Sequence, residues 1–242
     1  MSRAGTLRAG VIAAGRGDRL RSRSGVLKPL VRVGGRTLIE RVLRSIAEAR
    51  ASEVVVIINE DSLAVRDHVS AEAWPFALRW IVETTTSSMH SFLRVVETLS
   101  EGGDTGPFLI STVDTVAPRG AYARFVADAA QHRDASVALA IAPPTDDENP
   151  LLVKVDGSEV VAIGDAAAPA EHATAGYYAV RASILREADA ARRDEVSALR
   201  AFFARLLARG YPMVGIAVPQ SIDVDRPHDV DAAEHLLKRV TL

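Results

Sequence analysis

Short apolar runs alternate with longer amphipathic stretches through the first 142 residues, and this alternation constrains the fold more than any other feature. Runs such as VVVII and FLIST are apolar at every position, which is typical of strands that helices cover on both faces. A repeated order of strand, helix and strand favours parallel pairing with right-handed crossovers. We therefore expect an α/β fold, with a mainly parallel, doubly wound sheet and helices on both of its faces. The expected strands are 8–13, 53–58, 77–82, 107–113 and 135–142, and the expected helices are 37–50, 61–69, 88–100 and 119–132.

The pattern changes after Pro143, where the segment PPTDDENP indicates a turn-rich connection. The second half looks like an elaboration of the same sheet, so we expect a single domain over residues 1–242. Its expected elements are a hairpin at 151–164 with its turn at Asp156 and Gly157, a strand at 175–180, a helix at 195–209 that ends before Gly210, a strand at 213–218, and a helix at 227–238.

Composition excludes several classes of function. Lys and Arg number 29 against 31 Asp and Glu, so the charge is balanced and no basic footprint for nucleic acid is expected. The chain has no Cys, which excludes disulfides, cysteine nucleophiles and thiolate metal sites. Its six His residues lack ligand spacing, so zinc is not expected. The first apolar run, at 11–14, is too short for a signal sequence or a membrane span. We expect a cytoplasmic protein that binds neither nucleic acid nor membranes.

The strongest local signal is the glycine-rich loop after the first strand, VIAAGRGDR at 11–19. Such a turn lets backbone N–H groups approach a phosphate closely, and Arg19 offers a bidentate guanidinium contact. The loop is not a Walker loop, because no G-x-x-x-x-G-K-[ST] string occurs. It is not a dinucleotide fingerprint either, because Leu20 stands where the third glycine belongs. A plain tight turn between strand and helix is the structural alternative.

Two further motifs follow in order: Lys28-Pro-Leu, and then Gly34-Gly-Arg-Thr-Leu-Ile-Glu40. Together with the loop, they resemble the nucleotidyltransferase family that activates sugar phosphates and related phosphorylated alcohols. The resemblance implies a GT-A-like fold and an enzyme of the EC 2.7.7 type, which acts in sugar nucleotide biosynthesis. Such an enzyme transfers NMP from an NTP to a phosphorylated acceptor and releases pyrophosphate. Thr37 and Glu40 are explained by a capping box at the start of a helix, so we leave them out of the site.

The resemblance also implies roles for individual residues of these motifs. Ala13, Ala14, Gly15 and Gly17 would cradle the triphosphate. The catalytic residues would be Arg19 and Lys28: Arg19 would stabilise the departing pyrophosphate, and Lys28 would neutralise charge where the α-phosphate meets the acceptor phosphate. Residues of about 1–142 would then bind the nucleotide, and residues of about 143–242 would bind the acceptor.

Two aspartates are expected to hold Mg²⁺, which nucleotidyl transfer uses to bring two phosphate groups together. Asp114 ends the run FLISTV, so it should project from the carboxyl edge of the sheet, where ligands of open α/β sheets bind. In the family an Asp at this point ligates the metal, usually within a Gly-Asp pair, whereas Val113 precedes it here. The structural alternative is a turn aspartate before Pro118.

The second expected metal ligand is Asp225, in the segment SIDVDRPHD, which resembles the family's late (D/E)-I-D-T-P-E-D-L segment. Asp223 lies two residues earlier, on the same side if the chain is extended. Asp225 or Asp229 could instead stabilise the start of the helix at Pro227, and for Asp229 we favour that role. If the fold is as expected, Asp114 and Asp225 face one Mg²⁺.

The base and the acceptor have less specific candidates. The loop TTTSSMHS at 84–91 corresponds to the family's base-binding loop, with Ser88 as the best match and the alternative that Ser87 or Ser88 is an ordinary N-cap. The segment TAGYYA at 174–179 resembles the family's strand beside the acceptor, where Gly176 would allow close approach of the acceptor and Tyr177 or Tyr178 would form a wall of its pocket. Alternatively, Tyr177 and Tyr178 are core residues that point to opposite faces.

The nature of the acceptor is narrowed by one departure from the family. Many members that use sugar phosphates carry a Glu-Lys-Pro segment before the strand with Gly176, but here this region reads GDAAAP, without Lys. This disfavours an ordinary hexose 1-phosphate and favours a polyol, choline-like or unusual sugar phosphate. Family members of the polyol and choline type commonly use CTP, so we expect a pyrimidine triphosphate.

Two other functions stay open at this point. A GT-A glycosyltransferase would use a sugar nucleotide, but it would need a D-x-D pair, and Asp114 is followed by Thr115 and Val116. A non-catalytic nucleotide-binding regulatory protein would tolerate the loss of Arg19, Lys28 or the aspartates, and all of these are present. The sequence does not fix the oligomeric state, and a homo-oligomer is compatible with it.

Overall fold

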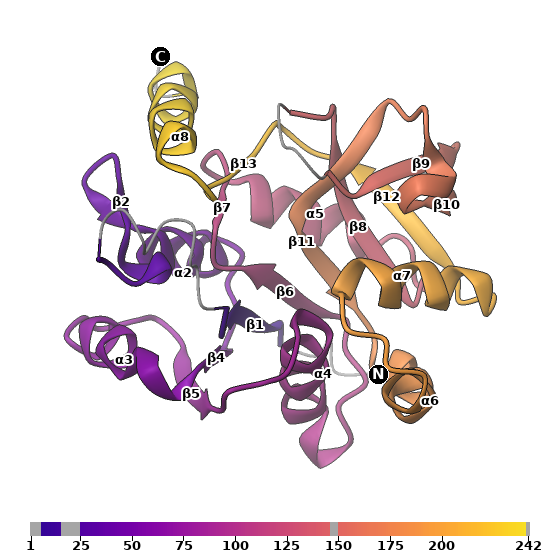
Figure 1. The fold of residues 1–242 in the computed structure, drawn as a ribbon, viewed down its shortest axis with the longest axis horizontal. Coiled ribbons are helices and arrows are strands. Elements are labelled where there is room, and N and C mark those ends of the chain that lie inside the picture. Colours follow the sequence, from indigo (N-terminus) through magenta and orange to yellow (C-terminus); the bar gives the residue numbers. More distant parts are fainter. Residues whose placement is uncertain (1–5, 16–24, 146–149, 241–242) are drawn as a thin grey trace.

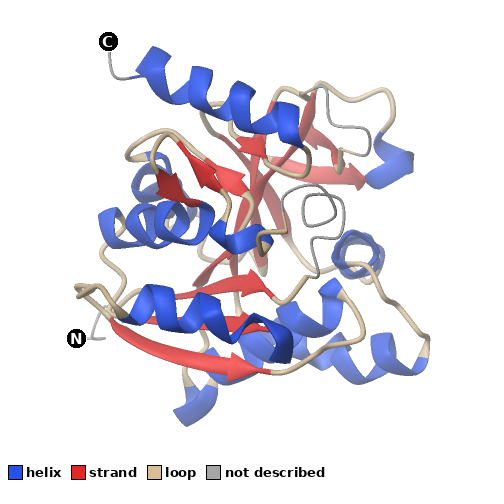
Figure 2. Cartoon of the chain, turned by 60° about the vertical axis from the view of Figure 1, so that its left-hand side comes forward, coloured by secondary structure: helices blue, strands red, loops and turns tan. Residues whose placement is uncertain are grey.

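One large sheet organises the chain, with helices packed on both of its faces (Figures 1 and 2). The computed structural model describes residues 6–15, 25–145 and 150–240. Within these residues the sheet has nine strands in the order β5-β4-β1-β6-β11-β8-β12-β10-β9. They are β1 (Arg8–Ala13), β4 (Glu53–Ile58), β5 (Ala77–Val82), β6 (Phe108–Thr112), β8 (Val137–Ala142), β9 (Leu152–Asp156), β10 (Glu159–Ile163), β11 (His172–Val180) and β12 (Met213–Ala217). Strands from both halves of the chain join this one sheet.

The helices divide between the two faces of the sheet. One face packs against α2, α3 and α5, and the other against α4, α6 and α7, whereas α8 lies over a small separate cluster with Val33, Val116 and Val224. Their bounds are α2 (Leu38–Glu48), α3 (Leu63–Ser70), α4 (Ser88–Leu99), α5 (Ala121–Ala129), α6 (Ala188–Arg193), α7 (Leu199–Ala208) and α8 (Pro227–Val240). Alternate residues of β4 enter the two apolar clusters, which explains why the run VVVII is apolar throughout.

The expected doubly wound α/β sheet is confirmed, and its parallel part is the half that carries the glycine-rich loop. β1 pairs in parallel with β4 and β6, and β4 pairs in parallel with β5. The carboxyl ends of these four strands therefore lie at the same edge. The segments that follow them carry Gly15, Ser88 at the start of α4, and Asp114, so the topology brings together residues that are far apart in the sequence.

The other half of the sheet is mixed. β11 runs antiparallel between β6 and β8, and the hairpin of β9 and β10 is antiparallel at the far edge, while β12 is parallel to β8. A parallel return needs a long crossover, usually an α-helix. Between β8 and β11 the described residues form only the hairpin and a 3-10 helix at Gly164–Ala167, so the chain re-enters the sheet in the opposite direction.

Element boundaries agree with the expectation to within a few residues, apart from one segment. The capping box is present: Thr37 Oγ1 accepts from the N–H of Glu40, and the Glu40 carboxylate accepts from the N–H of Thr37. The segment before α7 contains a 3-10 helix at Ala182–Glu187 and the short α6, which the sequence did not reveal. Pieces of six residues contain too few turns for apolar periodicity to be visible.

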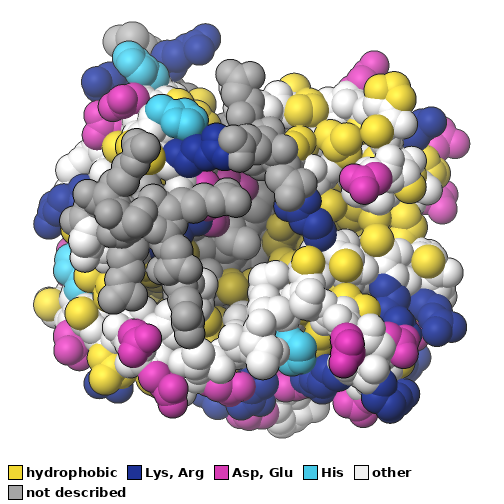
Figure 3. Space-filling model, in the orientation of Figure 1, with side chains coloured by type: hydrophobic (Ala, Val, Ile, Leu, Met, Phe, Trp, Pro, Cys, Tyr) yellow, Lys and Arg dark blue, Asp and Glu magenta, His cyan; other side chains and the backbone are white. Residues whose placement is uncertain are grey.

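Two small sheets complete the described structure. One joins β2 (Arg32–Val33) to β3 (Arg36–Thr37), and the other joins β7 (Thr115–Val116) to β13 (Ile222–Asp223). Within the described ranges, no helix combines the length and apolarity that crossing a membrane requires. On the face in Figure 3, basic and acidic side chains are interspersed.

Candidate active site

The centre of the candidate site is one ammonium group between two carboxylates. Lys28 begins a short 3-10 helix, Lys28–Leu30. Its Nζ lies 2.6 Å from Oδ2 of Asp114 and also contacts Oδ1 of Asp225. Burial by itself would lower the pKa of Lys28, but the two carboxylates outweigh burial and raise this pKa well above its ordinary value. The ammonium therefore stays charged, and the fold gathers three residues that both the motifs and the resemblance singled out.

A small two-stranded sheet joins the segments that carry the two carboxylates. β7 follows Asp114 directly, and it pairs antiparallel with β13, which ends two residues before Asp225. The backbone N–H of Val224 donates to the carbonyl oxygen of Asp114 at 3.0 Å. Asp114 and Asp225 thus lie on the same side of the main sheet, as expected.

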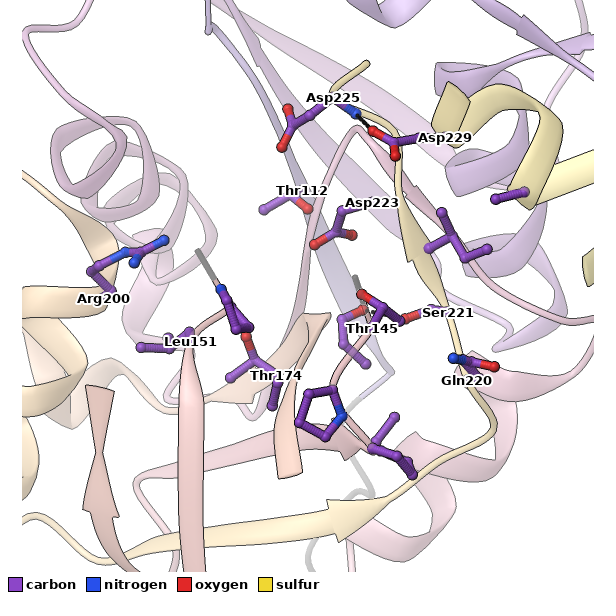
Figure 4. A pocket seen from close by; sticks show the side chains of 18 of the residues that line it. Thr112, Thr145, Leu151, Thr174, Arg200, Gln220, Ser221, Asp223, Asp225 and Asp229 are labelled. Carbon is purple, nitrogen blue, oxygen red and sulfur yellow. Dashed lines mark hydrogen bonds between the residues drawn. The ribbon is translucent and has the colours of Figure 1, made fainter. Parts of the chain in front are cut away.

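Asp229 stabilises the start of α8, in the role we favoured for it. Its Oδ2 accepts hydrogen bonds from the N–H groups of Asp225, at 3.0 Å, and Arg226, at 2.7 Å (Figure 4). N–H groups at the beginning of a helix have no partner within the helix, so a side-chain acceptor stabilises them. Because Asp229 takes this role, the carboxylate of Asp225 is left to face Lys28.

The two carboxylates fit a hard divalent cation such as Mg²⁺. Asp114 Oδ1 is buried and accepts no hydrogen bond from the described residues. Burial by itself would raise the pKa of Asp114, but the charge of Lys28 outweighs burial and lowers this pKa below its ordinary value. The carboxyl group is therefore ionised. No group of three or more acidic or His side chains is arranged to hold a metal within the described part of the chain. Mg²⁺ is commonly bound by one or two carboxylates together with substrate phosphates, which matches this donor set.

Asp223 is a third carboxylate beside the cluster. Its Oδ1 accepts a hydrogen bond of 2.8 Å from Oγ1 of Thr115, which in turn lies 2.9 Å from Oγ1 of Thr112. Burial, followed by the negative charges of Asp114 and Asp225, raises the pKa of Asp223 to about 7. Thr112 and Thr115 were not singled out by the sequence, although both flank Asp114 at the end of an apolar strand, where polar side chains are a usable signal.

The glycine-rich loop is described only in part. Ala13 is buried at the end of β1, and Ala14 and Gly15 line a cavity at the carboxyl edge of the sheet. A Cβ atom added to Gly15 would meet nothing within 4 Å, so its backbone is open to that cavity. Gly17 and Arg19 lie outside the described residues, and their expected roles stay predictions.

The loop between β5 and α4 presents hydroxyl groups to the same cavity. Ser87 is the N-cap of α4, because its side chain accepts from the N–H of His90. Ser88 Oγ accepts from the N–H of Leu199 at the start of α7, at 3.0 Å. Ser88 therefore connects the start of α4 to the second half of the chain.

Two cavities meet at the carboxylate cluster. The first, of about 580 Å³, is lined by Ala14, Gly15, Lys28, Asp114 and the hydroxyl-rich loop. The second, of about 570 Å³, lies over the mixed half of the sheet (Figure 4). The side chains of Ser88, Thr112 and Asp225 line both. Two compartments that share a charged boundary are suited to hold two substrates whose reacting groups meet there.

Two expected acceptor residues lie elsewhere. Gly176 has φ +81°, and a Cβ there would lie 1.9 Å from Thr115 Oγ1, so its close neighbour is a side chain of the protein and not a ligand. Tyr177 is fully buried with its ring stacked on Tyr122, centroids 4.3 Å apart, on the face away from the second cavity. The structure thus does not bring Tyr177 to the pocket. Tyr178 points to the opposite face and lines the second cavity, as does Arg200 of α7, which the sequence did not reveal.

The fold and this site define a nucleotidyltransferase. The chain belongs to the family of MobA-like NTP transferase domains, whose pattern matches residues 9–209. The resemblance read from the glycine-rich loop and the two following motifs is thereby confirmed. The match favours a nucleotidyltransferase over a glycosyltransferase, and nothing in it supports the non-catalytic alternative.

Solved structures share the fold over nearly their full length. The inositol-1-phosphate CTP transferase from T. maritima superimposes with a TM-score of 0.81 and 18% identity, covering 98% of this chain and 97% of that one. A UDP-glucose pyrophosphorylase complexed with UDP-glucose gives 0.75 and 12% identity, with coverage of 96% and 98%. The UTP-bound UGPase from Acinetobacter baumannii gives 0.74 and 16%, with coverage of 96% and 93%. No curated protein matches the sequence.

Proposed function

We propose that the chain transfers NMP from a pyrimidine nucleoside triphosphate to a phosphorylated alcohol and releases pyrophosphate. The observation that carries this proposal is the meeting of two cavities at the cluster of Lys28, Asp114 and Asp225. The triphosphate would occupy the cavity beside Gly15, and the acceptor would occupy the cavity beside Tyr178. In this division, residues of about 1–142 bind the nucleotide and residues of about 143–242 bind the acceptor, within one domain.

The reaction needs no covalent enzyme intermediate. An oxygen atom of the acceptor phosphate attacks the α-phosphorus, and the bond from the α-phosphorus to the oxygen that bridges to the β-phosphate breaks. Pyrophosphate leaves with that electron pair. The acceptor phosphate is already ionised near neutral pH, so no general base is required. The work of the protein is therefore to hold two anionic groups in line and to stabilise their charge.

Lys28 suits that task. Its ammonium lines the first cavity and contacts Asp225, which borders both cavities, so a non-bridging oxygen of the α-phosphate and the attacking phosphate would both be within its reach. The carboxylates of Asp114 and Asp225 would hold Mg²⁺, which supplies charge neutralisation for the triphosphate when it is bound. Gly15 would offer its backbone N–H to the phosphates, and Arg19 stays the predicted partner of the leaving pyrophosphate.

The pyrimidine preference rests on two kinds of support. The hydroxyl groups of Thr85, Thr86 and Ser88 line the nucleotide cavity, and they suit the carbonyl and amino groups at the edge of a small base. The names of the similar solved structures include a CTP transferase and a UTP-bound UGPase. Because nucleoside triphosphates are cytoplasmic metabolites, we propose that the protein works in the cytoplasm.

A screen of substrates tests the proposal. Pyrophosphate release would be measured with CTP, UTP, ATP and GTP, each with Mg²⁺ and each against inositol 1-phosphate, glucose 1-phosphate, glycerol 3-phosphate and phosphocholine. We expect release with CTP or UTP only when an acceptor phosphate is present. Tighter calorimetric binding of ATP or GTP would overturn the pyrimidine preference. Release that does not depend on any acceptor would indicate a hydrolase, and the proposed transfer would be wrong.

A further inference from the structure

The second cavity contains a carboxylate, that of Asp223, which has no role in the proposed transfer chemistry. Asp223 lines this cavity but not the nucleotide cavity. Figure 4 shows its carboxylate on the same side of the segment as that of Asp225, which borders both cavities. Two residues of extended chain span about 6–7 Å. Asp223 is therefore placed beyond the reacting phosphate, toward the body of the acceptor.

Three strands cooperate to hold this carboxylate in one position. Thr115 on β7 donates from Oγ1 to Asp223 Oδ1 at 2.8 Å. Thr115 is itself buried, and its hydroxyl occupies the space that a side chain at position 176 would fill, because a Cβ there would lie 1.9 Å from Thr115 Oγ1. Gly176 on β11 thus makes room for the hydroxyl that orients Asp223. Since the hydrogen bond uses Oδ1, Oδ2 is left for a ligand in the cavity.

The other described residues of the cavity indicate which ligand group this oxygen meets. Neutral polar side chains line it together with Asp223: Thr145, Thr174, Gln220 and Ser221. Among the described lining residues, Tyr178 is the single aromatic side chain. Quaternary ammonium groups are recognised by the faces of several aromatic rings, and they offer no N–H for a directed hydrogen bond.

We propose that Asp223, oriented by Thr115, accepts a hydrogen bond from a hydroxyl group of the acceptor, and that it thereby selects polyhydroxylated phosphates such as polyol and sugar phosphates over phosphocholine. This inference rests on the proposed function, because it assigns the second cavity to the acceptor. Discrimination of this kind is strong, since an acceptor without the hydroxyl leaves Oδ2 of a half-buried carboxylate without a hydrogen-bond donor.

The test uses the full chain with Asp223→Ala, and Asp156→Asn as a matched control at the exposed turn of the β9–β10 hairpin. With the polyol or sugar phosphate that the wild type uses best, Asp223→Ala should raise the acceptor KM about ten- to hundred-fold, the range for losing a hydrogen bond to a charged group. The dissociation constant of the NTP, measured by calorimetry, should stay within about two-fold of the wild-type value. Asp156→Asn should change neither quantity.

Two further measurements separate a contact with the acceptor from a general effect. Deoxy analogues of that acceptor would be tested one by one. For one of these analogues, the KM of the wild type should rise by the same factor that Asp223→Ala causes with the full acceptor. The KM of Asp223→Ala should not rise further with that analogue. Thr115→Val should raise the acceptor KM in the same direction, and Thr115→Ser, which keeps the hydroxyl, should restore it.

The outcomes that contradict the inference are distinct from failure of the proposed function. An unchanged acceptor KM in Asp223→Ala would overturn the inference. A variant in which only kcat and the dependence of turnover on metal change would also overturn it, as would a wild type that prefers phosphocholine. If the protein releases no pyrophosphate in the screen, binding of inositol 1-phosphate and glucose 1-phosphate would be measured directly by calorimetry. Binding to the wild type that is lost in Asp223→Ala would support Asp223 as a ligand contact even though the proposed transfer reaction would be wrong. Absence of binding to the wild type would overturn the role of Asp223.

Discussion

The backbone N–H of Val224 donates a hydrogen bond of 3.0 Å to the carbonyl oxygen of Asp114. This bond extends the short pairing of β7 with β13, and it fixes the late aspartate segment beside the end of β6. The carboxylates of Asp114 and Asp225 consequently share the ammonium of Lys28. The charge cluster depends on backbone pairing, so single side-chain changes in it should alter chemistry more than folding.

Replacement of Lys28 by Ala should therefore leave the fold intact and reduce turnover by roughly two or more orders of magnitude, the scale for losing one stabiliser of transition-state charge. Pyrophosphate release would be measured beside circular dichroism. Lys154→Ala, an exposed lysine on β9, is the control and should behave like wild type. Near-wild-type turnover in a folded Lys28→Ala protein would remove Lys28 from the mechanism.

The close approach of β11 and β7 predicts a difference between two glycines. Gly157 and Gly176 both have positive φ, so Ala at either position should lower the free energy of unfolding by about 1–2 kcal/mol. Only at position 176 would the added Cβ also overlap a neighbour, Thr115 Oγ1 at 1.9 Å. Overpacking adds about 1–3 kcal/mol, so Gly176→Ala should lose about 2–5 kcal/mol in total.

Urea denaturation with linear extrapolation measures both variants. Equal losses for Gly157→Ala and Gly176→Ala would mean that β11 yields to the added methyl group. The contact with Thr115 would then not be a constraint on the site.

The same region shows which features of the site can be predicted from the sequence and which cannot. Gly176 was recognisable as a position of close approach, but its neighbour belongs to a strand about sixty residues earlier, and no local pattern names such a partner. The faces of Tyr177 and Tyr178 were undecided for a related reason. Where both faces of a strand are buried, period-two alternation separates two faces without telling which one borders a cavity.

The parallel half was predictable because its signals are local. β1, β4, β5 and β6 are each a short, largely apolar run, and each run ends at a polar loop. The carboxyl-edge position of Asp114 follows directly. The antiparallel direction of β11 was not predictable in this way, since it depends on how the β9–β10 hairpin returns the chain so that β11 pairs antiparallel with β8 and β9.

The capping box of α2 makes stability depend on pH. Burial would raise the pKa of Glu40, but hydrogen bonds from Thr37 and the nearby His68 outweigh burial and lower it. A carboxyl group with a lowered pKa in the folded state stabilises the fold above its unfolded pKa, and this contribution is lost as the pH falls through the folded value. At pH 7, Glu40→Gln should be less stable than wild type by about 0.3–1 kcal/mol, the range for a negative charge at a helix N-terminus.

Melting temperatures measured from pH 7 down to the acid limit check this prediction. The difference between wild type and Glu40→Gln should shrink as the pH falls. Asp67→Asn, an exposed carboxylate on α3, should show no comparable trend. A difference that stays constant with pH would show that the charge of Glu40 does not stabilise the cap.

Divalent cations should compete with Lys28 for the same carboxylates, because its ammonium contacts both Asp114 and Asp225. Chelator should abolish pyrophosphate release and Mg²⁺ should restore it. Asp114→Asn should weaken the dependence of turnover on Mg²⁺ more than Asp225→Asn does. The side chain of Asp114 is 21% exposed against 45% for Asp225, and Asp114 Oδ1 has no hydrogen-bond partner within the described residues.

Lys28→Ala should have the opposite effect on the metal: Mg²⁺ should bind more tightly in calorimetry without nucleotide, although turnover should be slower. Removal of a positive charge favours a cation at the same carboxylates, whereas it disfavours two phosphates. If Lys28→Ala bound Mg²⁺ no better than wild type and neither aspartate variant changed the metal dependence, the cation would lie elsewhere, and Asp114 and Asp225 would serve only to position Lys28.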